Sequence, residues 1–258
     1  MIYETLIVTE DAGVGVIKLN RPTLMNALNT RMRAEITHAV KDLGTRLRVL
    51  VLTGEGRAFC SGQDLGDGVS VDELDLGRTL REDYEPMLRA IVECPLPVIS
   101  AVNGVAAGAG ANLALAADVV IAAQSASFLQ AFARIGLIPD AGGTYWLPRL
   151  TGFARAMGQS LFAEKVTADE AAAQGLIWAA VPDEDFEAEW RRRAMQLALG
   201  PTLAYGAIKR AIRASMANDL DAQLELEANL QAEVGRTRDF REGVMAFLEK
   251  RPARFEGR

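Results

Sequence analysis

Hydrophobic residues along this chain alternate between the patterns of strands and of helices. Residues 14–20 (VGVIKLN) and 47–56 (LRVLVLTGEG) are short, continuous apolar runs, as expected for strands that helices cover. Between them, apolar side chains recur at the spacing of one helix face: Met32, Ile36, Val40 and Leu43. His38 lies off this face, so we interpret it as a surface histidine. Strand, helix and strand form the recurring unit, which predicts an α/β fold.

The longest apolar segment, residues 97–123, is long enough to cross a bilayer. Polar residues and glycines interrupt it, namely Asn103, Asn112, Asp118, Gly104, Gly108 and Gly110. We therefore predict a buried strand at 97–103, a turn, a short helix at about 108–116 and a second buried strand at 118–123. This reading makes the segment part of a protein core and not a membrane anchor.

A further helix and strand are expected in the second half of the chain. Thr167 and Glu170 have the spacing of a capping box, and Gly175 is placed to end the helix that they start. The apolar run at 176–182 (LIWAAVP) predicts the next strand.

The remainder of the chain is predicted to be helical. Helices are expected at about 184–198, 202–216, 219–234 and 237–250. We therefore divide the chain into a core, residues 1–199, and a C-terminal helical region, residues 200–258. The last helix carries Phe240, Val244, Phe247 and Leu248 on one face. We expect this face to be buried against the core or against a neighbouring subunit.

Composition excludes several classes of function. The 258 residues are 50% hydrophobic and 24% charged, with a net charge of −6, so the chain has the apolar mass for a core but lacks the basic surface of a nucleic-acid-binding protein. The two cysteines, Cys60 and Cys94, and the single histidine form no disulfide framework or metal-ligand pattern. The first twenty residues do not read as a signal peptide, so a cytoplasmic protein is expected.

Two glycine-containing segments are candidates for binding a ligand through backbone amides. In AFCSGQDL (58–65), Gly62 allows a close approach that turns the next amide, that of Gln63, into a cleft. In residues 103–118, small residues lead into a helix whose first amides are unpaired and suit an oxygen that gains negative charge. The first segment can also be an ordinary loop with a glycine, and the second can also be a tight packing contact against a sheet. The GAG spacing does not match a dinucleotide-binding motif.

Asp140 is the candidate acid/base. It stands among apolar residues in RIGLIPDAGGTYWLPRL (134–150), where partial desolvation would raise the pKa of its carboxyl and suit it to proton transfer. The same letters also fit an ordinary turn.

Taken together, these segments resemble the crotonase superfamily of enoyl-CoA hydratases and isomerases. The likeness spans the chain and is carried by LNRPTLMNALN, AFCSGQDL, AVNGVAAGAGANLALAADVVIAA, GLIPDAGGT and REGVMAFLEKR. It implies a spiral of strand-strand-helix units with a C-terminal helical region that assembles trimers or dimers of trimers. It also implies a coenzyme A thioester as substrate, with no separate cofactor and no metal.

The resemblance assigns roles to individual residues. The oxyanion-hole amides fall on Gln63 and Ala109, and Lys250 falls where the family contacts coenzyme A. Members that hydrate enoyl thioesters carry two glutamates, and this sequence has Asn112 and Phe132 at those positions. Asp140 stands where certain isomerases and dehalogenases carry their working aspartate.

Within the superfamily, the sequence is most similar to the ring-1,2-epoxyphenylacetyl-CoA isomerases of phenylacetate degradation. The resemblance therefore implies an isomerase that forms the oxepin thioester, shifts enoyl double bonds, or does both, with Asp140 as the proton carrier. The alternatives are a Δ3-Δ2 enoyl-CoA isomerase or a hydratase of fatty-acid β-oxidation, and an acyl-CoA-binding protein without turnover. Residues 66–90 are expected to line the outer wall of the pocket.

Overall fold

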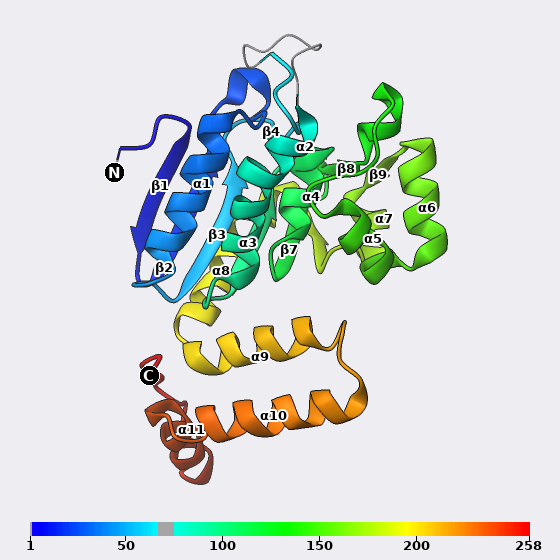
Figure 1. Ribbon diagram of the computed structural model, residues 1–258. Helices are drawn as coiled ribbons and strands as arrows, with labels where there is room; N and C mark the ends of the chain where they lie inside the picture. The colour runs from blue at the N-terminus through cyan, green and yellow to red at the C-terminus, as the bar shows by residue number, and fades with distance from the viewer. Residues whose placement is uncertain (1, 67–74) are drawn as a thin grey trace.

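The computed structural model describes residues 2–66 and 75–258, which form two β-sheets with helices packed around them (Figure 1). Within these ranges, the larger sheet contains, in spatial order, β1 (Leu6–Asp11), β2 (Val14–Leu19), β3 (Val49–Gly54), β5 (Val98–Val102), β7 (Val119–Ala123) and β10 (Ala179–Val181). β1 and β2 pair antiparallel, whereas the other neighbouring strands pair parallel. All residues of β3 and β5 are buried. Both faces of these strands are covered, which explains their unbroken apolar sequences.

The smaller sheet is built from short strands. In spatial order these are β4 (Ala58–Cys60), β6 (Val105–Ala107), β8 (Ser127–Leu129) and β9 (Lys165–Thr167). β6 pairs parallel with both β4 and β8, and β8 pairs antiparallel with β9. This sheet places the segments that follow β4 and β6 next to each other.

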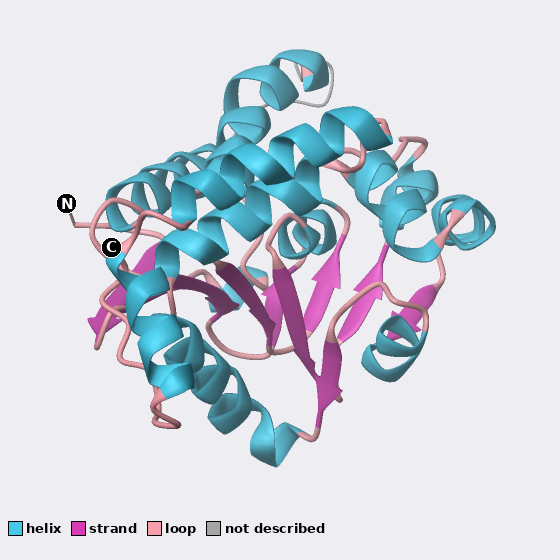
Figure 2. Ribbon diagram, turned by 90° about the horizontal axis from the view of Figure 1, so that it is seen from below, coloured by secondary structure: helices cyan, strands magenta, loops and turns pink. Residues whose placement is uncertain are grey.

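The helical segments pack around the strands of the two sheets, as Figure 2 shows. Those that precede β10 are η1 (Pro22–Leu24), α1 (Thr30–Leu43), α2 (Leu76–Thr79), η3 (Leu80–Tyr84), α3 (Glu85–Glu93), α4 (Ala109–Leu115), η4 (Ala131–Ile135), α5 (Gly143–Thr151), α6 (Phe153–Phe162) and α7 (Ala168–Ala173). Of these, η3 is a single π-helical turn.

The chain advances as a spiral in which each turn adds one strand to each sheet. β3 is followed by β4, β5 by β6 and β7 by β8, and helical segments follow each pair. The turns stack closely, because a Cβ atom on Gly104 would lie 2.2 Å from the carbonyl oxygen of Arg57 in the preceding turn. The predicted spiral of strand-strand-helix units is confirmed.

α1 forms for the reasons that its sequence indicates. The Asn29 side chain accepts a hydrogen bond from the Met32 amide at 2.9 Å and caps the helix. The four predicted apolar residues, Met32, Ile36, Val40 and Leu43, are all buried in the core. His38 is exposed, as predicted, and shares a hydrogen bond of 2.9 Å with the Tyr3 hydroxyl.

The segment at 97–123 contains one element more than expected. The two strands and the helix are confirmed as β5, β7 and α4, but the predicted turn holds the strand β6. β6 has only three residues, and its hydrogen-bond partners, β4 and β8, lie far away in the sequence. Such a strand has no local hydrophobic period that would indicate it. No helix in the described residues is long and apolar enough to span a membrane.

The capping box before α7 is present as predicted. The Thr167 hydroxyl accepts from the Glu170 amide at 3.3 Å, and the Glu170 carboxylate accepts from the Thr167 amide at 2.9 Å. The strand expected at 176–182 is the shorter β10.

The C-terminal helices extend from the end of the core (Figure 1). They are α8 (Asp183–Ala198), α9 (Thr202–Ala214), α10 (Leu220–Val234) and α11 (Arg238–Leu248), close to the predicted ranges. The proposed border at residues 199–200 falls in the connection between α8 and α9, and the division into two regions stays a prediction.

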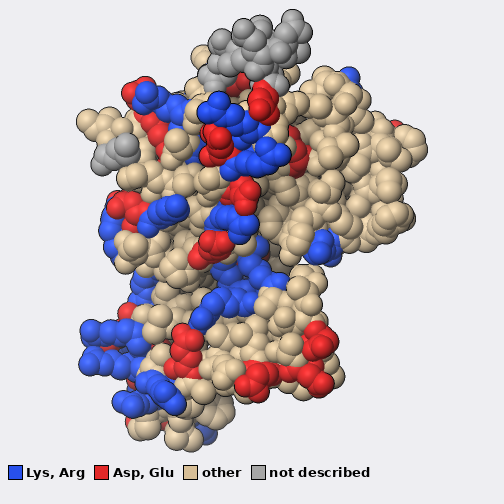
Figure 3. Space-filling view, in the orientation of Figure 1, with Lys and Arg blue, Asp and Glu red and all other residues tan. Residues whose placement is uncertain are grey.

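The apolar face of α11 remains open in the single chain. The side chains of Phe240, Val244 and Phe247 are 54%, 41% and 81% exposed, so the chain's own core does not bury them. Figure 3 shows a second surface with few charges at the upper right, over α5 and α6. Exposed apolar residues of α6 are Phe153, Met157, Leu161 and Phe162. Assembly into trimers or hexamers stays a prediction.

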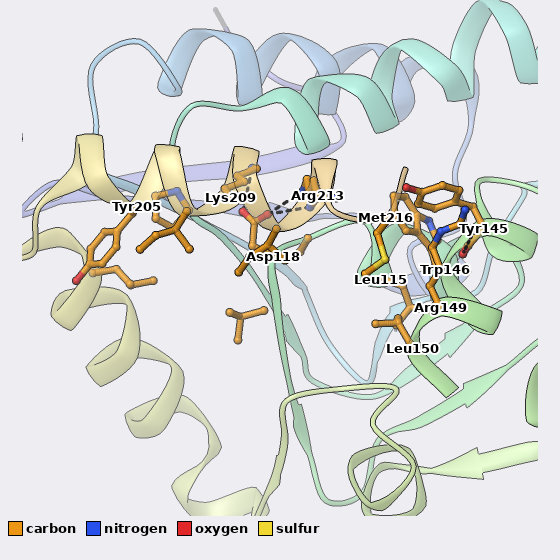
Figure 4. Close-up of a pocket in the computed structure, with 16 residues that line it drawn as sticks. Leu115, Asp118, Tyr145, Trp146, Arg149, Leu150, Tyr205, Lys209, Arg213 and Met216 are labelled. Atoms are coloured by element: carbon orange, nitrogen blue, oxygen red, sulfur yellow. Dashed lines mark hydrogen bonds and ion pairs between the residues drawn. The ribbon is translucent and has the colours of Figure 1, made fainter. Parts of the chain in front are cut away.

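Lys209 attaches α9 to the core. Its ammonium group lies 2.9 Å from the Asp118 carboxylate and donates to the carbonyl oxygens of Ile91 and Leu96 at 3.1 and 3.3 Å. Asp118 also binds Arg213 at 2.8 Å (Figure 4). A buried ammonium group with three partners holds the helix at a defined position.

We predict that Lys209→Ala lowers the free energy of unfolding by about 3 kcal/mol, because breaking a buried ion pair leaves polar groups without partners. Unfolding in urea measures the change. Lys165→Ala is the control, since Lys165 is exposed, and should alter stability by less than about 0.5 kcal/mol. Equal losses in the two variants would contradict the anchoring role of Lys209.

Candidate active site

The segments after β4 and β6 meet at Gly62. This glycine has a φ of +100°, and a Cβ atom on it would lie 2.9 Å from the carbonyl oxygen of Ala107 and 3.5 Å from the amide nitrogen of Ala109. Glycine is therefore required both by the backbone conformation and by the close approach. This contact brings Gln63, the next residue, close to the start of α4.

The amides of Gln63 and Ala109 are the candidate groups for binding a ligand oxygen. Leu28 forms hydrogen bonds with the backbone on both sides of Gln63. Its N–H donates to the Gly62 carbonyl at 2.8 Å, and its carbonyl accepts from the Asp64 amide at 3.1 Å. Within the described residues, neither the Gln63 amide nor the Ala109 amide donates a hydrogen bond to the protein. Two free N–H groups on adjacent segments can bind one oxygen that gains negative charge.

The side chain of Gln63 is held by two partners that lie deep in the protein. The hydroxyl of Tyr84, at the end of η3, donates to Gln63 Oε1 at 2.5 Å, and Arg33 of α1 donates to the same atom at 3.1 Å. Arg33 and Tyr84 are only 1% and 2% exposed. The Arg33 guanidinium lies 4.8 Å from the Tyr84 ring centre and also pairs with Asp83 at 2.7 Å. This network limits the movement of the segment that carries the Gln63 amide.

Asp140 lies in the turn between η4 and α5 and is partly buried. Its Oδ1 atom is shielded from solvent and has no hydrogen-bond partner among the described residues. Desolvation raises the pKa of this carboxyl from 3.8 to about 6. A carboxylate with such a pKa and a free oxygen can accept and return a proton near neutral pH.

Two further contacts relate Asp140 to the amides. Asn112 of α4 donates to the Asp140 carbonyl oxygen at 2.8 Å, and Asn112 is three residues after Ala109 in this helix. Burial raises the pKa of Tyr84, and the charge of Asp140 raises it further. Tyr84 therefore lies within electrostatic reach of Asp140 and is hydrogen-bonded to Gln63. The fold thus gathers the three predicted residues around one region.

The two positions where hydrating members of the crotonase superfamily carry glutamates are both buried here. Asn112 has no exposed surface, and Phe132 is 7% exposed. The Phe132 ring faces Gly108, since a Cβ atom on this glycine would lie 3.8 Å from the ring. Neither side chain can transfer a proton as a carboxylate does.

Lys250 does not join this group within one chain. It follows α11, which lies beyond α9 and α10, whereas β4 and α4 lie on the other side of α9 (Figure 1). Lys250 is exposed. Its contact with coenzyme A stays a prediction. Of the segment 66–90 expected to line the pocket, residues 67–74 lie outside the described residues.

Sequence reasoning missed three residues of this region: Arg33, Tyr84 and Gln130. A signal existed for Arg33, which lies three residues before Ile36 on the buried side of α1. A charge at such a position requires a partner. Tyr84 and Gln130 have no comparable pattern in the sequence.

A separate pocket of about 370 Å³ lies between α9 and the core (Figure 4). Its walls are mainly apolar and include Leu115, Trp146, Ile208 and Ile212. None of the predicted site residues lines it. The described residues contain no group of three or more His, Cys, Asp or Glu side chains placed to hold a metal ion.

Known proteins resemble this chain over its whole length. A "Probable enoyl-CoA hydratase" of Rhodobacter capsulatus is 63% identical over 258 residues, covering 100% of both chains. A "1,2-epoxyphenylacetyl-CoA isomerase" of Escherichia coli is 47% identical and covers 96% of this chain and 97% of its own. The crystal structure of an enoyl-CoA hydratase from Bacillus anthracis has 32% identity and a TM-score of 0.93, covering 99% of this chain and 100% of its own.

The sequence model of the family described as "Enoyl-CoA hydratase/isomerase" matches residues 9–258. This match covers nearly the whole chain and agrees with the two sheets and the C-terminal helices. The chain belongs to the enoyl-CoA hydratase/isomerase family, within the crotonase superfamily.

Proposed function

We propose that this protein is an isomerase of coenzyme A thioesters in which Asp140 is the proton carrier. The observation that carries the proposal is the Asp140 carboxyl, whose Oδ1 atom is shielded from water and has no partner among the described residues, in a turn hydrogen-bonded to α4, the helix that begins at Ala109. An oxygen of the thioester would accept hydrogen bonds from the Gln63 and Ala109 amides. Each such donor typically contributes about 3 to 4 kcal/mol to the stability of the transition state.

The proposed reaction moves a proton between two carbons. The Asp140 carboxylate removes a proton from the carbon next to the thioester carbonyl or from the vinylogous carbon. The electron pair of the C–H bond passes to the carbonyl oxygen. The two amides stabilise the resulting enolate. The protonated Asp140 then returns the proton to another carbon, so no atom is gained or lost. This scheme uses residues of the chain and no separate cofactor.

The substrate class has two candidates. The relative named 1,2-epoxyphenylacetyl-CoA isomerase favours a ring epoxide that isomerises to an oxepin thioester. In that case the bond between the two epoxide carbons also breaks, and its electron pair enters the double bonds of the enlarged ring, so that the atoms and electrons again balance. A shift of the double bond in an aliphatic enoyl thioester requires only the same single acid/base. We propose the first and expect the second as an accompanying activity.

Hydration is the competing reaction, because the relative with 63% identity is named a probable enoyl-CoA hydratase. Addition of water needs a positioned water molecule and a proton donor. Asn112 and Phe132 occupy the positions of the two glutamates that supply these functions by family resemblance. We therefore place isomerisation first.

Three further expectations from the sequence belong to this proposal. They are a cytoplasmic location, assembly into trimers or dimers of trimers, and a contact between Lys250 and coenzyme A, within one subunit or across two. The exposed apolar faces of α6 and α11 support the assembly.

Asp140→Asn should lower kcat of isomerisation by about 10²- to 10⁴-fold while KM changes little, because the amide keeps the shape but cannot accept the proton. Steady-state kinetics on aromatic-epoxide and enoyl thioesters measure both constants. Asp185→Asn, an exposed site in α8, is the matched control and should retain full activity. A nearly active Asp140→Asn variant, or a wild type that hydrates crotonyl-CoA faster than it isomerises any thioester, would contradict the proposal.

The pH profile offers an independent test. The base form of Asp140 is the ionised one, so kcat/KM should fall as the pH drops through the carboxyl pKa of about 6 and should be level above it. The kcat/KM of the wild type is measured between about pH 4.5 and 8, so that the range extends to both sides of this pKa. A profile that does not decline below pH 6 would exclude Asp140 as the base in the free enzyme.

The same carboxyl should reduce stability. The pKa of this carboxyl is higher in the folded protein than in the unfolded chain. Between pH 3.8 and about 6 the carboxyl therefore ionises more readily in the unfolded chain, which lowers the free energy of unfolding as the pH rises. This lowering is complete above that range. After allowance for solvent screening at this partly exposed group, Asp140→Asn should be more stable than wild type by about 1 to 2 kcal/mol at pH 7.5. The difference should shrink towards pH 4. Urea unfolding at both pH values measures it, and a difference independent of pH would show that the carboxyl is not desolvated.

A further inference from the structure

Two buried carboxamides lie beside the turn that carries Asp140. Asn112 is in the middle of α4 and has no exposed surface, and Gln130, just before η4, is 4% exposed. Gln130 Nε2 donates to Asn112 Oδ1 at 2.9 Å, and Asn112 Nδ2 donates to Gln130 Oε1 at 3.3 Å. Each amide thereby orients the other.

The remaining hydrogen of Asn112 Nδ2 is directed at the main chain of Asp140. Nδ2 donates to the Asp140 carbonyl oxygen at 2.8 Å, and the Gly143 amide donates to the same oxygen at 2.8 Å. A rotated Asn112 amide would place its oxygen against two other oxygens, so the pairing with Gln130 and Asp140 allows only one orientation. The carboxamide thus connects α4, the segment before η4, and the turn.

This turn needs support from outside itself. Ala141 has a φ of +48°, a left-handed conformation that is unfavourable for a residue with a Cβ atom. The Asp140 Oδ1 atom has no hydrogen-bond partner among the described residues. The direction of the carboxyl therefore depends on how the main chain is held.

The contact between Asn112 and the turn is also close. A Cβ atom on Gly143 would lie 2.4 Å from Asn112 Nδ2 and 3.0 Å from Asn112 Cγ. Because Gly143 has no side chain, the Asn112 amide can lie against the main chain of the turn that carries Asp140.

We propose that Asn112, locked by Gln130, is a positioning residue that holds the main chain of Asp140 and thereby aims its carboxylate at the substrate. This inference rests on the proposed role of Asp140 and deepens it. At the position where hydrating relatives carry a catalytic glutamate, this chain has an amide that acts only through Asp140. A carboxylate there would have no hydrogen to donate to the Asp140 carbonyl.

Burial is the cause of the raised pKa of Asp140. Tyr84, in η3, is electrostatically coupled to Asp140 and to Cys60 of β4. A charged group beside Tyr84 is Arg33 of α1, which pairs with Asp83 at 2.7 Å. Burial raises the pKa of Tyr84, and it raises the pKa of Cys60 to about 12, so both stay neutral at working pH. A change in the titration of Asp140 therefore reports on its own exposure to water.

The test uses Asn112→Ala and Gln130→Met in the full-length protein. In both, kcat should fall about 10- to 100-fold with little change in KM, because small misplacement of a reacting group has effects of this size. A loosened turn should admit water to the carboxyl. The midpoint of the acid limb of kcat/KM should consequently move below the wild-type value, towards that of an ordinary aspartate.

Asn103→Ala is the control, because this amide also holds main chain, accepting from Gly54 at 3.0 Å and donating to Gly56 at 2.9 Å. Within the described residues it forms no hydrogen bond with the Asp140 turn. It should lose stability without moving the pH midpoint. Folded Asn112→Ala and Gln130→Met proteins with wild-type kcat and midpoint would overturn the inference. If Asn112→Ala fails to fold, Gln130→Met decides, since it preserves the helix α4. Full activity of Asp140→Asn would instead reject the proposed function.

Discussion

The close contact between successive turns of the spiral is the constraint on which the site depends. Where the turns meet, a Cβ atom on Gly104 would lie 2.2 Å from one carbonyl oxygen of the preceding turn, and one on Gly110 would lie 2.4 Å from another. Backbone therefore packs directly on backbone, and Gly62 makes the same kind of approach with a positive φ. With side chains at these positions the turns would separate. The Gln63 and Ala109 amides could then no longer serve a single oxygen atom.

Around these amides, the protein satisfies most buried polar groups and leaves one carboxyl without a partner. Gln63 is hydrogen-bonded to Arg33 and Tyr84, whereas the Asp140 Oδ1 atom has no partner within the described residues. An unpaired buried carboxylate is unfavourable for stability and has a raised pKa. The same desolvation makes it an effective base. Rigid support of the main chain by Asn112 is consistent with this role, because an unpaired side chain cannot hold itself in place.

The family shares its fold while its reactions differ, so the chemistry must depend on a small number of side chains. Relatives of this chain at 63% and 47% identity carry the names of a hydratase and an isomerase. Position 112 illustrates how little needs to change. By the family resemblance, hydrating enzymes carry a glutamate at this position of α4, whereas the amide in this chain donates to a carbonyl and cannot move a proton.

Features that depend on neighbouring residues could be predicted from the sequence. Apolar period and capping residues predicted α1, β3, β5 and α7, and motif resemblance predicted the family and the roles of Gln63, Ala109 and Asp140. Tertiary structure alone decided the position of β6, whose partners lie in distant turns, and the contacts of Arg33, Tyr84 and Gln130 with the site. It also decided that α11, the helix before Lys250, lies apart from β4 and α4 and that the apolar face of α11 is open in the single chain. Local patterns record helix faces and turns, but a hydrogen bond between residues far apart in sequence leaves no periodic trace, because either partner alone could serve many other contacts.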